Sequence, residues 1–151
     1  MKVVKGNIFD LAEQGEFDVV VHGCNCFCTM GKGIAKEVKT RYPWVYRADL
    51  KTHKGDKDKL GTVSLESVQT GQHTFSIINA YTQYDYRGSV GTVNLDYEAL
   101  RSCFKHIKQR FSGCRIAYPK IGAGLAGGDW NIISAIIDEK LEGEDHTLVL
   151  L

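Results

Sequence analysis

Two short glycine-rich segments stand beside the few polar side chains that could take part in chemistry. His22 precedes the first segment, residues 23–33, which contains Asn25, and Asp129 follows the second, residues 122–128. Glycine lets backbone amides approach a ligand closely, and free amides at the start of a helix favour an anion. Histidine and aspartate can move protons, and asparagine can orient a sugar hydroxyl. These residues predict a site for an anionic small molecule with acid–base groups beside it.

Each of these residues also has a purely structural explanation, which the sequence leaves open. His22 ends an apolar strand and could be a core histidine with satisfied hydrogen bonds. Asp129 comes directly before a helix that should begin near Trp130, where it would be a good N-cap, and this role can coexist with a functional one. The glycine segments could simply form tight turns.

The elements that would position these residues alternate between strand-like and helix-like patterns. This alternation predicts one α/β domain over residues 1–151. The most regular helix pattern spans Leu95 to Phe111, with Asn94 as its expected N-cap. Both glycine segments would join a strand to a helix, at the carboxyl ends of strands where α/β proteins bind ligands. Strands are expected at 17–21, 62–68, 74–81, 115–118 and 146–151, and further helices at 34–42 and 130–141, with Pro43 ending the former.

Two nucleotide-binding motifs and a metal site are disfavoured by their context. The segment 122–127 formally matches G-x-G-x-x-G, but the next strand ends at 148–151 without the acidic residue that a dinucleotide-binding unit needs. No Gly-Lys-Ser/Thr follows the glycines, which excludes a P-loop. Cys24, Cys26 and Cys28 lack a second pair of ligands, so we expect neither a metal nor a cofactor.

Composition excludes several classes of protein. The chain has 151 residues, a net charge of +1 and 16 glycines. Such balanced charge leaves no basic footprint for duplex DNA, and no apolar run is long enough to span a membrane. Five cysteines without a signal-peptide pattern suggest a reducing compartment. We therefore expect a cytoplasmic protein that binds neither membrane nor duplex nucleic acid, and we expect it to be a monomer.

Four segments, in this order and spacing, resemble the macrodomain family of ADP-ribose-binding proteins. They are Lys5-Gly6-Asn7-Ile8, His22-Gly23-Cys24-Asn25-Cys26, Met30-Gly31-Lys32-Gly33-Ile34-Ala35 and the run from Pro119 to Gly128. The resemblance implies a three-layer α/β/α sandwich with a mixed central sheet.

The resemblance also implies how ADP-ribose would lie. Asn7 and Ile8 would meet the adenine, although Asn7 stands where many macrodomains have aspartate. Asn25 and residues 31–34 would hold the distal ribose and a nearby phosphate, and residues 122–127 would wrap the diphosphate. The ligand-contacting residues expected on this basis are Gly6, Asn7, Ile8, Cys24, Met30, Gly31, Lys32, Gly33, Ile34, Ile121, Gly122, Ala123, Gly124, Leu125, Ala126, Gly127 and Leu151.

Among subgroups, the chain looks most like the fungal-type ADP-ribose 1''-phosphate phosphatases. That likeness implies hydrolysis of ADP-ribose 1''-phosphate, with His22, Asp129 and Asn25 as the catalytic residues. Two alternatives remain: a mono-ADP-ribosyl hydrolase acting on modified protein or nucleic acid, and a non-catalytic ADP-ribose-binding module. The related ADP-ribose–glutamate hydrolases use a lysine nucleophile after the strand that here contains Ile77 and Ile78, but residues 79–83 contain no lysine.

Overall fold

A mixed β-sheet carries most of the apolar strand residues and forms the middle layer. The computed structural model describes residues 1–88 and 91–151, and within them the sheet has six strands in the order β1-β6-β5-β2-β4-β3. All neighbouring strands are parallel except β3, which runs antiparallel to β4 at the end of the sheet. The strands are β1 (Lys2–Lys5), β2 (Val19–Cys24), β3 (Val63–Thr70), β4 (His73–Tyr81), β5 (Arg115–Tyr118) and β6 (Asp145–Leu150).

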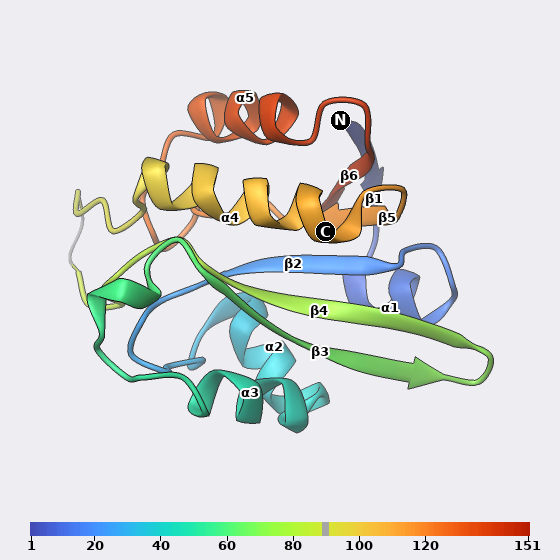
Figure 1. The fold of residues 1–151 in the computed structure, drawn as a ribbon, viewed down its shortest axis with the longest axis horizontal. Coiled ribbons are helices and arrows are strands. Elements are labelled where there is room, and N and C mark those ends of the chain that lie inside the picture. The colour runs from blue at the N-terminus through green and yellow to red at the C-terminus, as the bar shows by residue number, and fades with distance from the viewer. Residues whose placement is uncertain (89–90) are drawn as a thin grey trace.

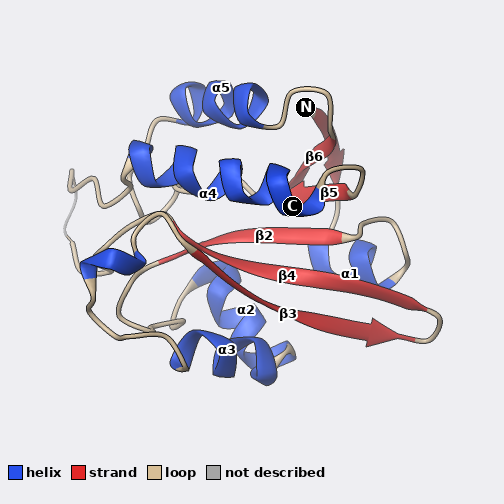
Figure 2. Ribbon diagram, in the orientation of Figure 1, coloured by secondary structure: helices blue, strands red, loops and turns tan. Residues whose placement is uncertain are grey.

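Helices cover both faces of this sheet, as Figure 1 and Figure 2 show. One face carries α4 (Tyr97–Phe111) and α5 (Trp130–Lys140). The other carries α1 (Ile8–Glu13), α2 (Gly33–Arg41) and α3 (Pro43–Leu50), and a short 3-10 helix, η1 (Lys57–Lys59), follows α3. The three-layer α/β/α sandwich with a mixed sheet is therefore confirmed. In the part of the chain that the structure describes, no helix has both the length and the apolar character needed to cross a bilayer.

The central strand β2 explains why both layers of helices are needed. Val19 and Val21 belong to the core under α4 and α5, while Val20 belongs to the core over α1 to α3. Successive side chains of a strand point to opposite faces, so an unbroken apolar run is typical of a strand buried on both sides.

Three local features differ from the sequence-based expectations. β2 continues past Val21 to Cys24, because this stretch stays paired with β4. The N-cap of α4 is Asp96 rather than Asn94, and its side chain accepts a hydrogen bond from the amide of Ala99 at 2.9 Å. β1 and α1 had no counterpart among the expected elements. Pro43 ends α2, as expected, and also begins α3, where its missing N–H costs nothing.

Candidate ligand-binding site

The two glycine segments lie together at one edge of the sheet. Each follows one of two adjacent parallel strands: the first leaves β2 after Cys24, and the second leaves β5 after Tyr118. The second loop also touches β2 just before the first loop begins, because a methyl carbon of Ile121 lies 3.1 Å from the position that a Cβ on Gly23 would take. A ligand at this edge can therefore reach both loops.

The second loop, residues 121–128, presents a run of unpaired backbone amides. Its turns are closed by hydrogen bonds from the amide of Ala123 to the oxygen of Lys120 at 3.3 Å, from Gly127 to Gly124 at 3.1 Å and from Gly128 to Gly122 at 2.7 Å. Amides grouped in this way can bind a phosphate or diphosphate. Four amides of the loop have no hydrogen-bond acceptor among the described residues, namely those of Gly122, Gly124, Leu125 and Ala126.

This loop is held firmly against the segment that leads into α4. The oxygen of Ala126 accepts from the amides of Asn94 and Leu95 at 2.9 and 3.2 Å. Gly127 has a φ of +74°, and a Cβ there would lie 2.5 Å from the backbone oxygen of Thr92. Only glycine fits such a position, so the shape of the loop depends on that residue.

The first loop ends at the start of α2, which has no side-chain cap. Lys32 occupies the N-cap position without a capping hydrogen bond, and Gly33 begins the helix with a φ of +58°. Gly31, Lys32 and Gly33 are all exposed. The positive end of the α2 dipole and the Lys32 ammonium group therefore face solvent, where they can attract an anion.

Asn25 holds the first loop in shape. Its side-chain nitrogen donates to the oxygen of Thr29 at 2.9 Å, and its side-chain oxygen accepts from the amide of Phe27 at 2.9 Å. The side chain is buried. In this structure Asn25 positions the loop backbone, and its expected contact with a ribose remains a prediction.

Asp129 caps α5 and still has a free oxygen. One carboxylate oxygen accepts from the amide of Asn131 at 2.9 Å, and the amide of Asp129 itself donates to the Tyr97 hydroxyl at 3.0 Å. The side chain is exposed, and its second oxygen has no hydrogen-bond partner among the described residues. The capping role and a chemical role can therefore coexist, as the sequence suggested.

His22 lies in the core, which corrects its expected place at the loop surface. It sits inside β2 with none of its surface exposed, and its Nε2 lies 2.6 Å from the side-chain oxygen of Asn79. Burial lowers the pKa of His22 to about 4, although the hydrogen bond to Asn79 opposes this shift. A ring with no exposed atoms does not reach a ligand in this structure, which favours the structural explanation of His22.

On the adenine side, Asn7 is also engaged in local structure. Its side-chain oxygen caps α1 by accepting from the amides of Phe9 and Asp10, both at 3.0 Å. Its side-chain nitrogen donates to Glu37 at 3.2 Å. The carbonyl that was expected to meet the adenine is thus already occupied by the helix.

The remaining predicted ligand residues divide by exposure. Leu151 is fully exposed, at the end of the chain next to β6. The loop residues at the shared edge that keep exposed surface are Gly31, Lys32, Gly33, Ile34, Gly122, Ala123, Gly124, Leu125 and Gly127, and Gly6 is half-buried next to Asn7. Those that are buried, and so support the loops from beneath, are Ile8, Cys24, Met30, Ile121 and Ala126.

Thr82 is a candidate that sequence reasoning missed. It follows β4 at the same edge of the sheet, and its hydroxyl is buried without a hydrogen-bond partner within the described residues. This oxygen lies 2.9 Å from the position of a Cβ on Gly23. In the sequence, the only sign of Thr82 was that a polar residue follows an expected strand. Residues 79–83 were considered only because they contain no lysine.

Known proteins of similar sequence identify the family of this chain. The Macro domain family model matches residues 21–137. An uncharacterized 17.5 kDa protein of Enterobacteria phage T4 is 35% identical over 143 residues, which cover 91% of this chain and 88% of that protein. A DNA ADP-ribosyl glycohydrolase of Mycobacterium tuberculosis is 30% identical over 119 residues, 78% of this chain, but the match spans only 33% of the glycohydrolase.

Solved structures share the fold. The macrodomain of Thermus aquaticus DarG superimposes with a TM-score of 0.75 at 23% identity, covering 99% of this chain and 97% of that one. Thermosipho africanus DarTG in complex with ADP-ribose gives a TM-score of 0.74 at 20% identity, covering 100% of this chain and 42% of that one. With the family match over most of its length and two glycine loops at one sheet edge, the chain belongs to the macro domain family.

Proposed function

We propose that this chain is an ADP-ribosyl hydrolase that releases ADP-ribose from modified nucleic acid. One observation carries the proposal: the unpaired amides of Gly122, Gly124, Leu125 and Ala126 precede Asp129, which has a free carboxylate oxygen. An anion-binding surface and an acid–base group thus belong to one short segment. The names of the mycobacterial glycohydrolase and of the DarTG complex support ADP-ribose as the ligand and glycosidic hydrolysis as the reaction.

The diphosphate of the ligand would lie against the second loop. Four free amides there supply hydrogen bonds without a net positive charge, and the open start of α2 with Lys32 adds favourable electrostatics from the other side. A chain with a net charge of +1 has little general affinity for phosphate backbones. Recognition of the substrate would therefore rest on its ADP-ribosyl group, as suits an enzyme that acts on modified sites alone.

The chemistry is the hydrolysis of the bond between the distal ribose and a base. Water attacks the anomeric carbon, the carbon–nitrogen bond breaks, and the base leaves with a proton in place of the sugar. The free oxygen of Asp129 would take a proton from the water and stabilise the positive charge that develops on the ribose. Thr82 and the loop held by Asn25 would shape the pocket around that ribose.

The ADP-ribose 1''-phosphate phosphatase activity that the subgroup resemblance implies is less well supported. It assigned the nucleophilic or acid–base role to His22, whose side chain has no exposed surface. The lysine route of the ADP-ribose–glutamate hydrolases is a separate matter: residues 79–83 contain no lysine, so the hydrolysis proposed here uses direct attack of water. The phosphatase reaction therefore enters as the competing outcome of the test.

The test compares three substrates: a single-stranded oligonucleotide with one ADP-ribosylated base, a peptide with an ADP-ribosylated carboxylate, and ADP-ribose 1''-phosphate. We expect the wild type to release ADP-ribose from the oligonucleotide, and Asp129→Asn to lose about a hundredfold or more in rate. Asparagine still caps α5, so the variant should keep the wild-type melting temperature. Phosphate release alone would establish the phosphatase, and tight ADP-ribose binding without turnover of any substrate would establish a non-catalytic binding module.

A further inference from the structure

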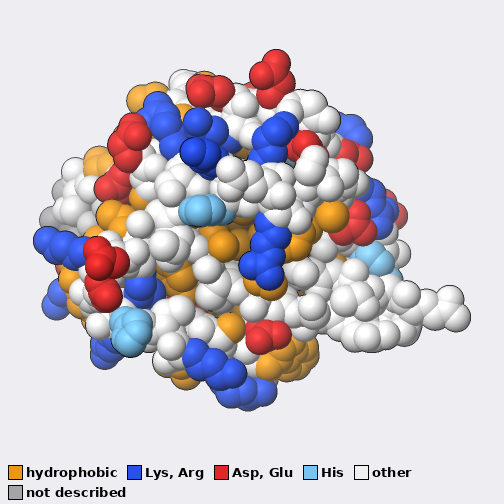
Figure 3. Space-filling view, in the orientation of Figure 1, with side chains coloured by type: hydrophobic (Ala, Val, Ile, Leu, Met, Phe, Trp, Pro, Cys, Tyr) orange, Lys and Arg blue, Asp and Glu red, His pale blue; other side chains and the backbone are white. Residues whose placement is uncertain are grey.

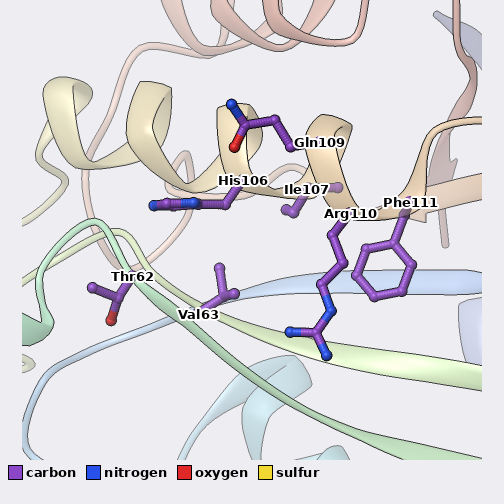
Figure 4. A pocket seen from close by; sticks show the side chains of 7 residues that line it. All are labelled: Thr62, Val63, His106, Ile107, Gln109, Arg110 and Phe111. Atoms are coloured by element: carbon purple, nitrogen blue, oxygen red, sulfur yellow. The ribbon is translucent and has the colours of Figure 1, made fainter.

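A concave site lies between α4 and the edge strand β3, away from the glycine loops. It is a groove of about 430 Å³, and Figure 4 shows the side chains around it. In Figure 3 apolar surface is visible along this groove, with basic and histidine side chains beside it. The lining residues are Thr62, Val63, His106, Ile107, Gln109, Arg110 and Phe111.

The floor of the groove is apolar because α4 does not cover the last strand completely. Val63 and Leu65 are only partly buried, and both pack against the core under α4 and α5. Ile107 and Phe111 face them from the last turns of α4. An apolar strip of this kind remains in contact with water unless a partner covers it.

The backbone beside this floor has free hydrogen-bonding groups. β3 ends the sheet, so one of its edges has no strand partner among the described residues. The oxygen of Thr62 accepts from Tyr81 on the β4 side, while the oxygen of Ser67 accepts from the Trp44 indole at 2.9 Å on the outer side. Because groups alternate along a strand, Val63 and Leu65 point their N–H and C=O groups outward like Ser67. Within the described residues nothing binds these groups.

The rim of the groove on α4 carries the cationic side chain of Arg110. Arg110 reaches from α4 across the groove in Figure 4, and no carboxylate of the described residues forms an ion pair with it. His106 and Gln109 are exposed on the same rim. An unpaired guanidinium group beside an apolar floor selects a partner that carries a carboxylate near an apolar side chain.

We propose that this groove binds an extended segment of a partner protein, which adds as a further strand to β3. Its backbone would pair with the outward groups of Val63 and Leu65. Alternate side chains of the added strand would point toward α4, where an apolar residue would cover the floor and an acidic residue two positions away would meet Arg110. A helix beside a free strand edge supplies both the backbone pairing and the side-chain pockets that such recognition needs.

The apolar floor and free strand edge favour a peptide over a nucleic acid. A phosphate backbone would use Arg110 but would leave the outward N–H and C=O groups of β3 and the apolar strip without suitable partners. Nucleic acid is therefore the competing outcome of the experiment. The proposal does not depend on the hydrolase activity, because none of the lining residues belongs to the glycine loops.

The experiment selects binders from a library of random octapeptides displayed on phage, using the folded wild-type chain. The enriched peptides are then synthesised and titrated against three variants. Arg110→Glu reverses the rim charge, and Val63→Pro removes one outward N–H without touching the ladder to β4. Lys105→Glu is the matched control, because Lys105 is exposed on α4 but does not line the groove. Melting temperatures verify that each variant is folded, and Arg110→Glu alone suffices should Val63→Pro fail to fold.

We expect enriched peptides with apolar and acidic residues two positions apart. Their affinity should fall about tenfold or more in Arg110→Glu and Val63→Pro, and should not change in Lys105→Glu. Bound peptide should also slow hydrogen exchange at the amides of Val63 and Leu65. The proposal is overturned if no peptide is enriched, or if the enriched peptides bind Arg110→Glu as tightly as wild type. It is equally overturned if single-stranded oligothymidylate displaces them and itself binds Val63→Pro as well as wild type.

Discussion

The Nε2 atom of His22 and the side-chain oxygen of Asn79 lie 2.6 Å apart in the interior, and this contact fixes the histidine in one tautomer. The side-chain nitrogen of Asn79 donates to the backbone oxygen of Val45 at 3.4 Å and to the Ser64 hydroxyl at 3.1 Å; since a carbonyl only accepts, the Asn79 oxygen is the atom that faces the ring. His22 must then carry its proton on Nε2. The sulfur of Cys24 lies 3.6 Å from Nε2 and 3.7 Å from Nδ1, and it can donate a weak hydrogen bond to Nδ1, the nitrogen without a proton.

This buried neutral ring predicts a loss of stability at acidic pH. The pKa of His22 is about 4 in the folded chain, because burial disfavours the charged form, whereas an unfolded chain has the ordinary value of about 6.5. The contribution of His22 to the free energy of unfolding is complete above pH ~6.5. It is lost as the pH falls toward ~4, since in this range only the unfolded state binds the proton. The free energy of unfolding should fall by about 1.4 kcal/mol per pH unit in this window.

Urea unfolding at a series of pH values measures this slope. Carboxylates also titrate near its lower end, so the comparison is with His22→Gln, whose side-chain amide can still donate to Asn79. Across this window the free energy of unfolding of the variant should depend less on pH than that of wild type, and the difference in slope should correspond to about one proton. Equal slopes for wild type and variant would contradict the neutral, buried state of His22.

Asp129 should show two separable roles. Asp129→Ala removes the N-cap of α5 and should lower the free energy of unfolding by about 1 kcal/mol, while Asp129→Asn should leave it nearly unchanged. Both variants should lose hydrolase activity, because neither has a carboxylate. Thermal unfolding measured beside turnover tests this, and an active Asp129→Asn would remove the carboxylate from the proposed chemistry.

Two glycines of the second loop should respond differently to the same substitution. A Cβ on Gly124 meets nothing within 4 Å, whereas one on Gly128 would lie 2.7 Å from the oxygen of Gly122 and would also collide with Leu95. Gly128→Ala should therefore destabilise the fold by about 1–3 kcal/mol. Gly124→Ala should keep full stability.

The same pair tests how closely a ligand approaches the loop. An added methyl group at Gly124 would stand between the free amides and a diphosphate, so ADP-ribose affinity should fall about tenfold in Gly124→Ala. Calorimetry with ADP-ribose gives this value directly. An unchanged affinity in a folded Gly124→Ala variant would mean that the diphosphate does not lie there.

The buried ion pair behind the first loop should be costly to break. The Nζ of Lys59 lies 3.8 Å from a carboxylate oxygen of Asp49, and both side chains are more than nine-tenths buried. Lys59 also donates to the oxygen of Cys26 at 3.3 Å, which ties the pair to the loop. Lys59→Met should lower the free energy of unfolding by about 3 kcal/mol, because it leaves the Asp49 carboxylate buried without its cation.

The double variant Lys59→Met/Asp49→Asn provides the control. Removing the charge of Asp49 as well should restore part of the lost stability, since the uncompensated charge is the main cost. Denaturant unfolding of both single variants and the double variant forms the cycle. Strict additivity of the two changes would show that the pair is not coupled.

Local patterns predicted most of the fold but only part of the site. The apolar run at 19–21 and the spacing from Leu95 to Phe111 were enough to locate β2 and α4, and the glycines marked both loops. His22 was misplaced because the length of β2 depends on pairing with β4, which lies more than fifty residues away in the chain. A single sequence does not contain that register.

The roles of the amide side chains also depend on local structure. Asn7 and Asn25 were expected to bind ligand; in this structure they cap α1 and hold the first loop, and their ligand contacts remain predictions. Whether an asparagine caps its own backbone or faces a ligand depends on how the chain turns locally. The groove at β3 could not be foreseen either, because it joins Val63 to Arg110 from distant parts of the chain.

The helix α4 runs from the second loop to the groove beside β3. Residues just before its first turn hold the oxygen of Ala126 in the second loop, and its last turns line the groove beside β3. Its 15 residues span about 22 Å. A partner in the groove and a ligand on the second loop would therefore contact opposite ends of one helix. If binding at one end alters α4 at the other, each ligand would change the affinity for the other by the same factor, and titrating ADP-ribose with and without the groove peptide measures that factor.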